Sequence, residues 1–341
     1  MSPLRRNTLG NHSARVWCVS PFPDNERVVS ASHDGAVIVW NLRTMEEERR
    51  WDHERATAVA VSPDGKMVVS GGDDGALQLW DADSGDHLSG PWQQHENERR
   101  VWSVSWSPDG GRVASCSADD TLVIWNASSG EALLGPLQTE HKYVRAIAYC
   151  PKGRKVATGG HDSTIKIWND DTGVLQVTLR GHTERVSSVA WTKCGSRIIS
   201  GSVDRTVRVW DCLKEQTVHV IQHTGAINCI AVSDHVFATA SADHTIHLWD
   251  LETYQRLDLD GSFELSKRDE AHCVALTADE NTLVACTEKY QVYTFDIKEI
   301  VGGRLGRVGK AWDAIRHSRV VVAVYGMIVR VVKPLSFGFV Q

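Results

Sequence analysis

The stretch SGSVDRTVRVWD at residues 200–211 places an Asp four residues after a Ser and six residues before a Trp. Five other stretches keep this spacing, with Thr in place of Ser in two of them. They are SASHDGAVIVWN (30–41), SGGDDGALQLWD (70–81), SCSADDTLVIWN (115–126), TGGHDSTIKIWN (158–169) and TASADHTIHLWD (239–250). Successive tryptophans in the set are 39 to 45 residues apart. The chain is therefore built from an internal repeat.

The pattern within each unit predicts a strand, a tight turn and a second strand. Small and apolar residues precede the Asp, as in RIISGS (197–202), and apolar residues alternate with others after it, as in VRVW (207–210). Another strand lies upstream, as in VAVSPDG (59–65), and a more variable fourth follows, as in GVLQVTLR (173–180). Four short antiparallel strands in roughly every 40–45 residues are typical of the blades of a β-propeller.

These repeats resemble the WD-repeat β-propeller family over roughly residues 3–297. The resemblance implies that four side chains of each unit, His, Ser or Thr, Asp and Trp, form a buried hydrogen-bonded chain between the outer loop and the inner strands. The expected tetrads are His12/Ser30/Asp34/Trp40, His53/Ser70/Asp74/Trp80, His95/Ser115/Asp119/Trp125, His141/Thr158/Asp162/Trp168, His182/Ser200/Asp204/Trp210 and His223/Thr239/Asp243/Trp249. The chemistry is suitable, because a buried carboxylate needs donors and an imidazole can join it to a hydroxyl.

Ser, His and Asp are also the components of a hydrolytic triad. A nucleophile needs one site with an oxyanion hole and a substrate cleft, whereas this constellation occurs six times at a fixed spacing. The repetition favours a structural role. We therefore expect no catalytic residue, no cofactor and no small-molecule substrate.

A seventh unit is expected at residues 271–297, where the strand pattern continues without the polar residues. Lys267, Ala285, Lys289 and Phe295 stand in the places of His, Ser or Thr, Asp and Trp. The sequence thus predicts an all-β, seven-bladed propeller of four-stranded antiparallel blades over residues 1–297. Its repeats end near Trp40, Trp80, Trp125, Trp168, Trp210, Trp249 and Phe295. The resemblance implies that an N-terminal strand, at about Pro3 to Leu9, completes the degenerate seventh blade and removes its open edge.

Residues 298–341 form a separate basic tail, with eight Lys or Arg residues against Glu299 and Asp313. Two interpretations stay open for it: additional strands, or a poorly ordered end. Association of the tail with a membrane surface is less favoured, because the mostly apolar run at 319–332 is too short to span a bilayer.

Composition narrows the class of protein further. A formal net charge of −6 gives no overall basic field, so we expect no direct binding of nucleic acid. The eight cysteines are scattered and form no C-x-x-C pair, which argues against a metal site. The first ten residues lack the apolar core of a signal peptide. We expect a cytoplasmic or nuclear protein that is not secreted.

The resemblance also implies that partners bind on the ring face that carries the turn aspartates, here called the Asp-turn face. Two positions in each blade are expected there, one at the start of the innermost strand and one directly before the turn Asp. The candidate residues are Trp17, His33, Thr57, Asp73, Trp102, Arg145, His161, Ser187 and Asn228. Trp and Arg are enriched at interface hot spots, so one hypothesis is an aromatic and basic patch across blades 1, 3 and 4 for an acidic or phosphorylated peptide. The alternative is that both tryptophans pack against neighbouring blades.

Because a fold alone does not define a function, the sequence supports only a general role. We expect a non-catalytic scaffold that binds partner proteins or peptides. A chromatin or histone-tail reader and a ubiquitin-ligase substrate receptor are the alternatives. The receptor is less favoured, since such proteins usually carry an adaptor-binding segment and none is expected before residue 10.

Overall fold

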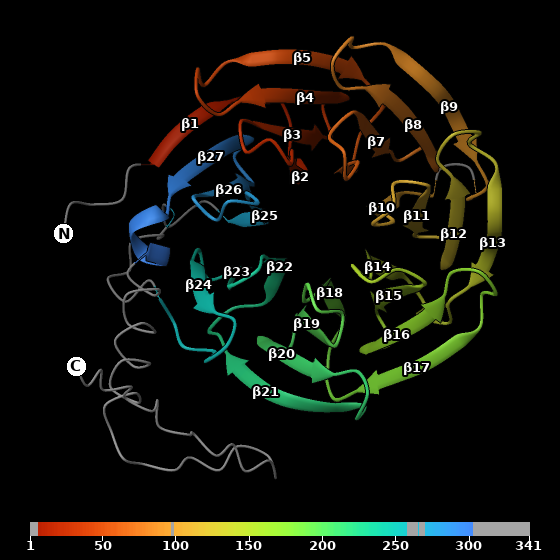
Figure 1. The fold of residues 1–341 in the computed structure, drawn as a ribbon, viewed down its shortest axis with the longest axis vertical. Coiled ribbons are helices and arrows are strands. Elements are labelled where there is room, and N and C mark those ends of the chain that lie inside the picture. Colours follow the sequence, from red (N-terminus) through yellow and green to blue (C-terminus); the bar gives the residue numbers. More distant parts are fainter. Residues whose placement is uncertain (1–5, 97–98, 258–264, 266–269, 303–341) are drawn as a thin grey trace, which may run out of the picture. The chain divides into compact units, whose positions relative to one another are not determined.

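The computed structural model describes residues 6–96, 99–257, 265 and 270–302. These residues form seven small antiparallel sheets arranged as blades around a ring (Figure 1). The prediction of a seven-bladed, all-β propeller is confirmed. The first strand of each blade lies innermost, and the following strands run outward in order.

The strands have the following bounds. Blade 1 contains β2 (Val16–Pro21), β3 (Arg27–Ser32), β4 (Ala36–Asn41) and β5 (Glu47–Asp52). Blade 2 contains β6 (Ala58–Val61), β7 (Met67–Gly71), β8 (Ala76–Asp81) and β9 (His87–Gln93). Blade 3 contains β10 (Val101–Trp106), β11 (Arg112–Ser117), β12 (Thr121–Asn126) and β13 (Ala132–Gln138). Blade 4 contains β14 (Val144–Tyr149), β15 (Lys155–Gly160), β16 (Thr164–Asn169) and β17 (Leu175–Arg180).

The remaining three blades complete the ring. Blade 5 contains β18 (Val186–Trp191), β19 (Arg197–Ser202), β20 (Thr206–Asp211) and β21 (Gln216–Gln222). Blade 6 contains β22 (Ile227–Val232), β23 (Val236–Ser241) and β24 (Ile246–Asp250). Blade 7 contains β25 (Ala271–Leu276), β26 (Thr282–Thr287), β27 (Gln291–Asp296) and β1 (Arg6–Asn11).

The hydrophobic core lies between neighbouring blades. Each apolar cluster draws buried side chains from two adjacent sheets, as where Val209 of blade 5 packs with Ile227 and Phe237 of blade 6. Both faces of the middle strands are covered, which is why sequences such as RIISGS read as almost continuous runs of small and apolar residues. This packing fixes the inner strands, and with them the side chains at the start of each one.

The N-terminal strand closes the ring, as predicted. β1 pairs antiparallel with β27 and is the outermost strand of the seventh blade (Figure 1). The strand runs on to Asn11, beyond the predicted end at Leu9, while the predicted start at Pro3 lies outside the described residues. Leu9 is buried in a cluster that also contains Trp40 and Val292. β1 therefore joins blade 7 to blade 1 by packing as well as by backbone hydrogen bonds.

The C-terminal part of the compact unit extends slightly beyond the predicted boundary at residue 297. The unit ends at Val301, within a helical turn over residues 298–302, and the side chains of Ile297 and Val301 are buried. The expectations for the rest of the basic tail and for Lys267 fall outside the described residues. In the part of the chain that the structure describes, no helix is long and apolar enough to cross a membrane.

Candidate functional site

The indole and hydroxyl groups of the six expected tetrads are in hydrogen-bond contact. Each Trp Nε1–H donates to the Ser or Thr oxygen of its own blade, at 2.8 Å in five blades and 3.0 Å in blade 6. A ring nitrogen of the expected His lies 2.7–2.9 Å from the same oxygen in blades 1 to 5, and 3.5 Å from it in blade 6. Each hydroxyl is therefore engaged on two sides.

The hydroxyl residue of every tetrad is completely enclosed by the blade. The exposed fraction is 0% for each of the six, which are Ser30, Ser70, Ser115, Thr158, Ser200 and Thr239. A side chain without exposed surface cannot contact a partner, a substrate or a cofactor in this conformation. Ser30, Thr239 and their four equivalents are therefore not part of any accessible binding or catalytic site.

Ser30 shows a tight version of the arrangement, and Thr239 shows the loosest. Ser30 Oγ lies 2.8 Å from both His12 Nε2 and Trp40 Nε1. Thr239 Oγ1 lies 3.0 Å from Trp249 Nε1 but 3.5 Å from His223 Nε2, at the outer limit of a hydrogen bond. The sequence predicted the same hydrogen-bonded chain in all six blades. In blade 6 the hydrogen bond between the imidazole and the hydroxyl is weaker than in the other five.

Blade 5 illustrates the full chain. Asp204 Oδ2 lies 2.8 Å from His182 Nδ1, and His182 Nε2 lies 2.7 Å from Ser200 Oγ. The assignment that satisfies every group has Nδ1–H donating to the carboxylate, the Ser200 hydroxyl donating to Nε2 and the indole N–H of Trp210 donating to Ser200. With both sides of its oxygen occupied, the hydroxyl holds the blade together and is not placed to attack a substrate.

Burial and hydrogen bonding act in opposite directions on the turn aspartates. Burial raises the pKa of Asp204, but hydrogen bonds from the Thr206 hydroxyl and the Thr183 N–H and the nearby His182 outweigh it, so that the pKa is lowered. The pKa values of the other five turn aspartates are lowered as well. For His182, burial is the largest influence and lowers the pKa, so its neutral form is favoured.

The connection between turn aspartate and outer loop differs in blades 2 and 6. In blade 2, His53 contacts Ser70 through Nδ1, at 2.7 Å, and its Nε2 lies 3.6 Å from Asp74. In blade 6, Asp243 accepts hydrogen bonds from the Thr224 hydroxyl and from the Gly225 N–H. The turn aspartate is thus tied to its outer loop in more than one way.

The two positions expected on the Asp-turn face lie together in each blade. In six blades, the residue before the turn Asp, or before Lys289 in blade 7, donates its backbone N–H to the carbonyl that precedes the inner strand. Examples are His33 to Arg15 at 2.9 Å and His161 to Tyr143 at 3.1 Å. The turn and the start of the inner strand are therefore held against each other.

The residue expected to open each inner strand is instead its second residue in six of the seven blades, and there it occupies a β-bulge. In blade 1, Val16 pairs with Ser32 and Cys18 with Ala31, which leaves Trp17 as the extra residue. The same register shift leaves Trp102, Arg145, Ser187, Asn228 and His272 unpaired in their strands. A bulge changes the direction of a side chain relative to a regular strand. This feature is absent from the sequence pattern, which gave only the position.

Three of the candidate residues connect neighbouring blades. The Thr57 hydroxyl donates to the carbonyl of Val101 at 2.6 Å, and the Ser187 hydroxyl donates to the carbonyl of Ile227. The Asn228 amide donates to the carbonyl of Ala271 at 3.0 Å. These polar groups are engaged within the ring, so they are less suited to receive a partner than the larger residues at the same position.

Trp17, Trp102 and Arg145, from blades 1, 3 and 4, meet one another. The rings of Trp17 and Trp102 have centroids 5.8 Å apart in an edge-to-face arrangement. The Arg145 guanidinium lies 3.6 Å from the Trp102 centroid and 5.9 Å from that of Trp17. The Arg100 guanidinium lies 4.6 Å and 5.1 Å from the same two centroids. We refer to Trp17, Trp102, Arg100 and Arg145 as the Trp–Arg cluster.

The other three candidates, His33, Asp73 and His161, lie in charged pairs or ring contacts near this cluster. Asp73 accepts hydrogen bonds from Arg100 and lies 3.1 Å from His33 Nε2. The His161 ring packs on Tyr143, with centroids 5.2 Å apart. Burial, and then the nearby Arg185 and Arg145, lower the pKa of His161. Asp73 therefore neutralises part of the positive charge, whereas His161 lies among cations.

Sequence reasoning missed four arginines near the starts of the inner strands. Arg15, Arg100 and Arg185 directly precede the inner strands of blades 1, 3 and 5, and Arg55 holds the equivalent position in blade 2. The detectable signal is an Arg two positions before the candidate residue, repeated in four units. Arg15 pairs with Glu288 of blade 7, and Arg55 lies 3.8 Å from Asp73. The Asp-turn face is thus rich in arginine in a protein whose net charge is negative.

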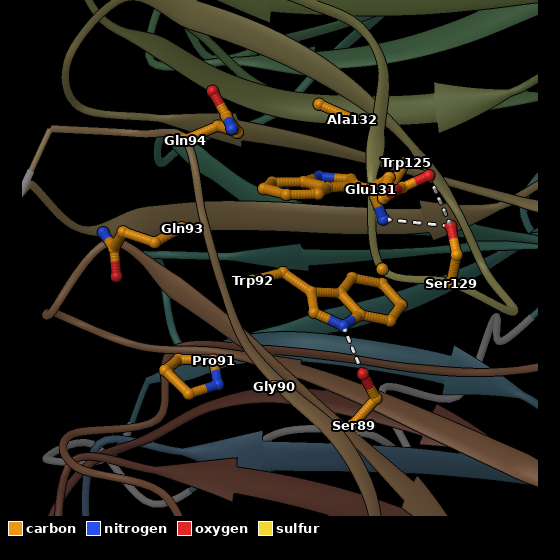
Figure 2. Close-up of a pocket in the computed structure, with 11 residues that line it drawn as sticks. Ser89, Gly90, Pro91, Trp92, Gln93, Gln94, Trp125, Ser129, Glu131 and Ala132 are labelled. Atoms are coloured by element: carbon orange, nitrogen blue, oxygen red, sulfur yellow. Dashed lines mark hydrogen bonds between the residues drawn. The ribbon is translucent and has the colours of Figure 1, made fainter.

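Two hollows among the described residues are large enough to receive a small group. One of about 800 Å³ lies on the Asp-turn face between blades 2 and 3, and its lining includes Arg55, Asp73, Arg99 and Arg100. The other, of about 640 Å³, lies between outer strand β9 and the turn into β13 (Figure 2).

Polar groups in the second hollow bond to one another. Trp92 Nε1–H donates to the Ser89 hydroxyl at 2.9 Å, and the Glu131 N–H donates to Ser129 Oγ at 3.3 Å (Figure 2). Because the Trp92 and Glu131 donors are satisfied locally, this hollow is the weaker candidate for a ligand site. The part of the chain that the structure describes contains no group of three or more His, Cys, Asp or Glu side chains able to hold a metal ion.

The repeated blades and their shared tetrads define a repeat-built β-propeller. A family model described as the WD domain, G-beta repeat, matches residues 4–41, 47–81, 88–126, 134–169, 173–211 and 215–250. The six matches together cover more than half of the chain, and the protein belongs to the WD40-repeat family. The three inner strands of the seventh blade, β25 to β27, lie outside the matched segments, whereas β1 lies within the first of them. A search of curated proteins found no match.

Proposed function

We propose that this protein is a non-catalytic scaffold that binds acidic or phosphorylated segments of partner proteins on its Asp-turn face. The observation that carries the proposal is the Trp–Arg cluster, in which aromatic and cationic side chains from blades 1, 3 and 4 converge. Trp and Arg supply much of the binding energy at protein interfaces. WD40 propellers are commonly used as interaction scaffolds, which is consistent with this role.

The charge of the cluster favours an acidic partner. Arg145 has no carboxylate partner among the described residues, and Arg185 and Arg100 are close enough to disfavour its charged form. A basic segment such as a histone tail would add positive charge to these groups and would be repelled. We therefore favour a scaffold for acidic segments over a chromatin reader.

The arrangement of the tetrads supports the absence of catalysis. The Ser and Thr hydroxyls are fully buried and each is bonded to both an indole and an imidazole, as at Ser115 and Thr158. A serine nucleophile must reach both a base and a substrate carbonyl. Six equivalent and buried copies serve the fold instead.

The test is affinity purification followed by mass spectrometry, with the wild type compared with the double variant Trp17→Ala/Arg145→Ala. Partners should be captured by the wild type and lost from the double variant. Arg99→Gln removes one positive charge from an exposed ion pair on the same face and should keep the partners. Equal capture by the wild type and the double variant would exclude the Trp–Arg cluster as the binding site. Thermal melting should show that the double variant is folded, because unfolding would explain the loss equally well.

A further inference from the structure

The arginines of the Asp-turn face differ in whether an acidic side chain balances them. Arg15 is paired with Glu288, and Arg100 is hydrogen-bonded to Asp73. In the part of the chain described here, Arg145 and Arg185 make no ion pair, although they belong to the adjacent blades 4 and 5. Arg145 is the second residue of β14 and Arg185 directly precedes β18, and these two inner strands are neighbours, so two cationic groups without a counter-charge lie at the starts of adjacent inner strands.

Arg145 and Arg185 influence each other electrostatically. Burial, followed by the positive charges of Arg185 and Arg100, lowers the pKa of Arg145 to about 10. The group nevertheless stays protonated near neutral pH. A partly buried charge beside like charges is costly unless an anion compensates it. The same two arginines also lower the pKa of His161, after burial, so the positive field extends over that side chain.

The geometry of Arg145 leaves its hydrogen-bond donors available. The Cζ atom of Arg145 lies 3.6 Å from the centroid of the Trp102 ring, so one face of the guanidinium covers the ring. The N–H groups lie in the plane of the guanidinium and are not consumed by this contact. A guanidinium held in this way presents a planar fork that matches the oxygens of a phosphate or carboxylate. Trp17 Nε1–H is a further donor, and it is buried without an acceptor among the described residues.

We propose that Arg145 and Arg185 bind the phosphate group of a phosphorylated side chain in the partner segment, with Trp102 holding Arg145 in place. This inference rests on the proposed function and narrows it from acidic or phosphorylated segments to a phosphate monoester. A phosphate carries a charge of about −1.5 to −2 at neutral pH and three acceptor oxygens, so it can engage both guanidinium groups. A carboxylate carries one charge and would leave one arginine unbalanced. Arg185 is exposed, which leaves the site accessible from solvent.

The experiment measures binding of three probes to the full chain by isothermal titration calorimetry at constant ionic strength near neutral pH. The probes are inorganic phosphate, N-acetyl-O-phosphoserine amide and N-acetylglutamate amide. We expect both phosphates to bind and the glutamate compound to bind at least about fivefold more weakly. Equal binding of the glutamate compound, or no binding of phosphate, would overturn the proposal.

The variants locate the site. Arg145→Gln and Arg185→Gln should each weaken binding of the phosphoserine compound about tenfold or more, as expected for loss of a charge-assisted hydrogen bond. Arg99→Gln makes the same change of charge on the same face and should have less than a twofold effect. An equal loss in all three variants would mean only general electrostatic attraction and would contradict a defined site. Arg185→Gln keeps the test valid if Arg145→Gln does not fold, because Arg185 is exposed.

This result is separable from the test of the proposed function. If the scaffold captures partners through Trp17 and Arg145 but binds neither phosphate probe, the specific inference fails and the scaffold stands. If phosphate binds at Arg145 and Arg185 but no partner depends on the Trp–Arg cluster, the proposed function fails instead.

Discussion

Blades 5 and 7 each have three equivalent inner strands, but different interactions stabilise the two blades. In blade 5, the buried chain of His182, Ser200, Asp204 and Trp210 joins the outer loop to the middle of the sheet. In blade 7, apolar side chains occupy the hydroxyl and indole positions, and both Ala285 and Phe295 are buried. Lys289, at the aspartate position, is exposed. Strand pairing and apolar packing are thus sufficient to build a blade without the polar chain.

The outer strand of blade 7 shows what replaces the polar chain. β1 comes from the opposite end of the chain and pairs with β27, whereas β21 of blade 5 follows β20 directly in sequence. The β1 segment also inserts Leu9 and Gly10 against blade 1. A Cβ at Gly10 would lie 2.3 Å from a Trp40 ring carbon, so only glycine permits the observed approach. Blade 7 is stabilised by ring closure, and blade 5 by a local network.

The largest expected effect is on closure. Deletion of residues 1–9 removes most of β1 and the buried Leu9, and leaves β27 as an open edge. We expect a loss of at least about 3 kcal/mol in the free energy of unfolding, since truncation of a buried Leu to Ala alone costs about 2–5 kcal/mol. Urea denaturation followed by tryptophan fluorescence measures it. Leu9→Ala serves as the single-residue version. A deletion variant with the stability of the wild type would refute closure by β1.

The second prediction compares equivalent positions in the two blades. Asp204→Ala leaves His182, the Thr206 hydroxyl and the Thr183 N–H without their acceptor. Loss of these bonds should cost about 1–3 kcal/mol. Lys289→Ala is the matched change in blade 7, and an exposed substitution of this kind should stay within about 0.5 kcal/mol.

The test depends on the difference in unfolding free energy between the Asp204→Ala and Lys289→Ala variants. Equal destabilisation by Asp204→Ala and Lys289→Ala in the same urea titration would mean that the polar chain contributes nothing particular to blade 5. Circular dichroism spectra matching the wild type would show that the sheets persist in both variants.

The sequence predicted the blades and the closing strand because both rest on local, repeated signals. The alternation in VRVW (207–210) and the fixed spacing of Asp204 and Trp210 recur in six units. The degenerate seventh blade was predicted from its strand pattern and from the need to close the ring. The bulges could not be predicted, because register depends on the pairing of two strands and not on the composition of one.

The candidate site was predictable only in part for the same reason. Trp17, Trp102 and Arg145 were selected by position and residue type, but their convergence depends on where blades 1, 3 and 4 lie around the ring. Thr57 occupies the same position in blade 2 and bonds to the neighbouring blade instead. Which residues join the Trp–Arg cluster and which connect blades is decided by side-chain length and by acceptors that are remote in sequence.

The smallest expected effect is a pH dependence of stability that comes from His182 in the polar chain of blade 5, a chain that blade 7 lacks. Burial is the largest influence on His182 and lowers its pKa in the folded state below the ordinary value of 6.5. As the pH falls below 6.5, the unfolded chain therefore takes up a proton at this residue that the folded chain does not. The contribution to stability is complete above that pH and declines below it, by at most about 1.4 kcal/mol per pH unit.

Urea titrations between neutral pH and about pH 5 should reveal this decline, and comparison with His182→Gln isolates its source. The variant is expected to be less stable at neutral pH, because Asp204 and Ser200 lose a partner, yet its stability should fall less steeply with acidification. His12, whose pKa burial also lowers, remains in the variant and accounts for part of the residual slope. Identical slopes for the wild type and His182→Gln would mean that the imidazole of blade 5 titrates alike in the folded and unfolded chains. The contrast between the polar chain of blade 5 and the apolar packing of blade 7 would then have no consequence for the acid stability of the ring.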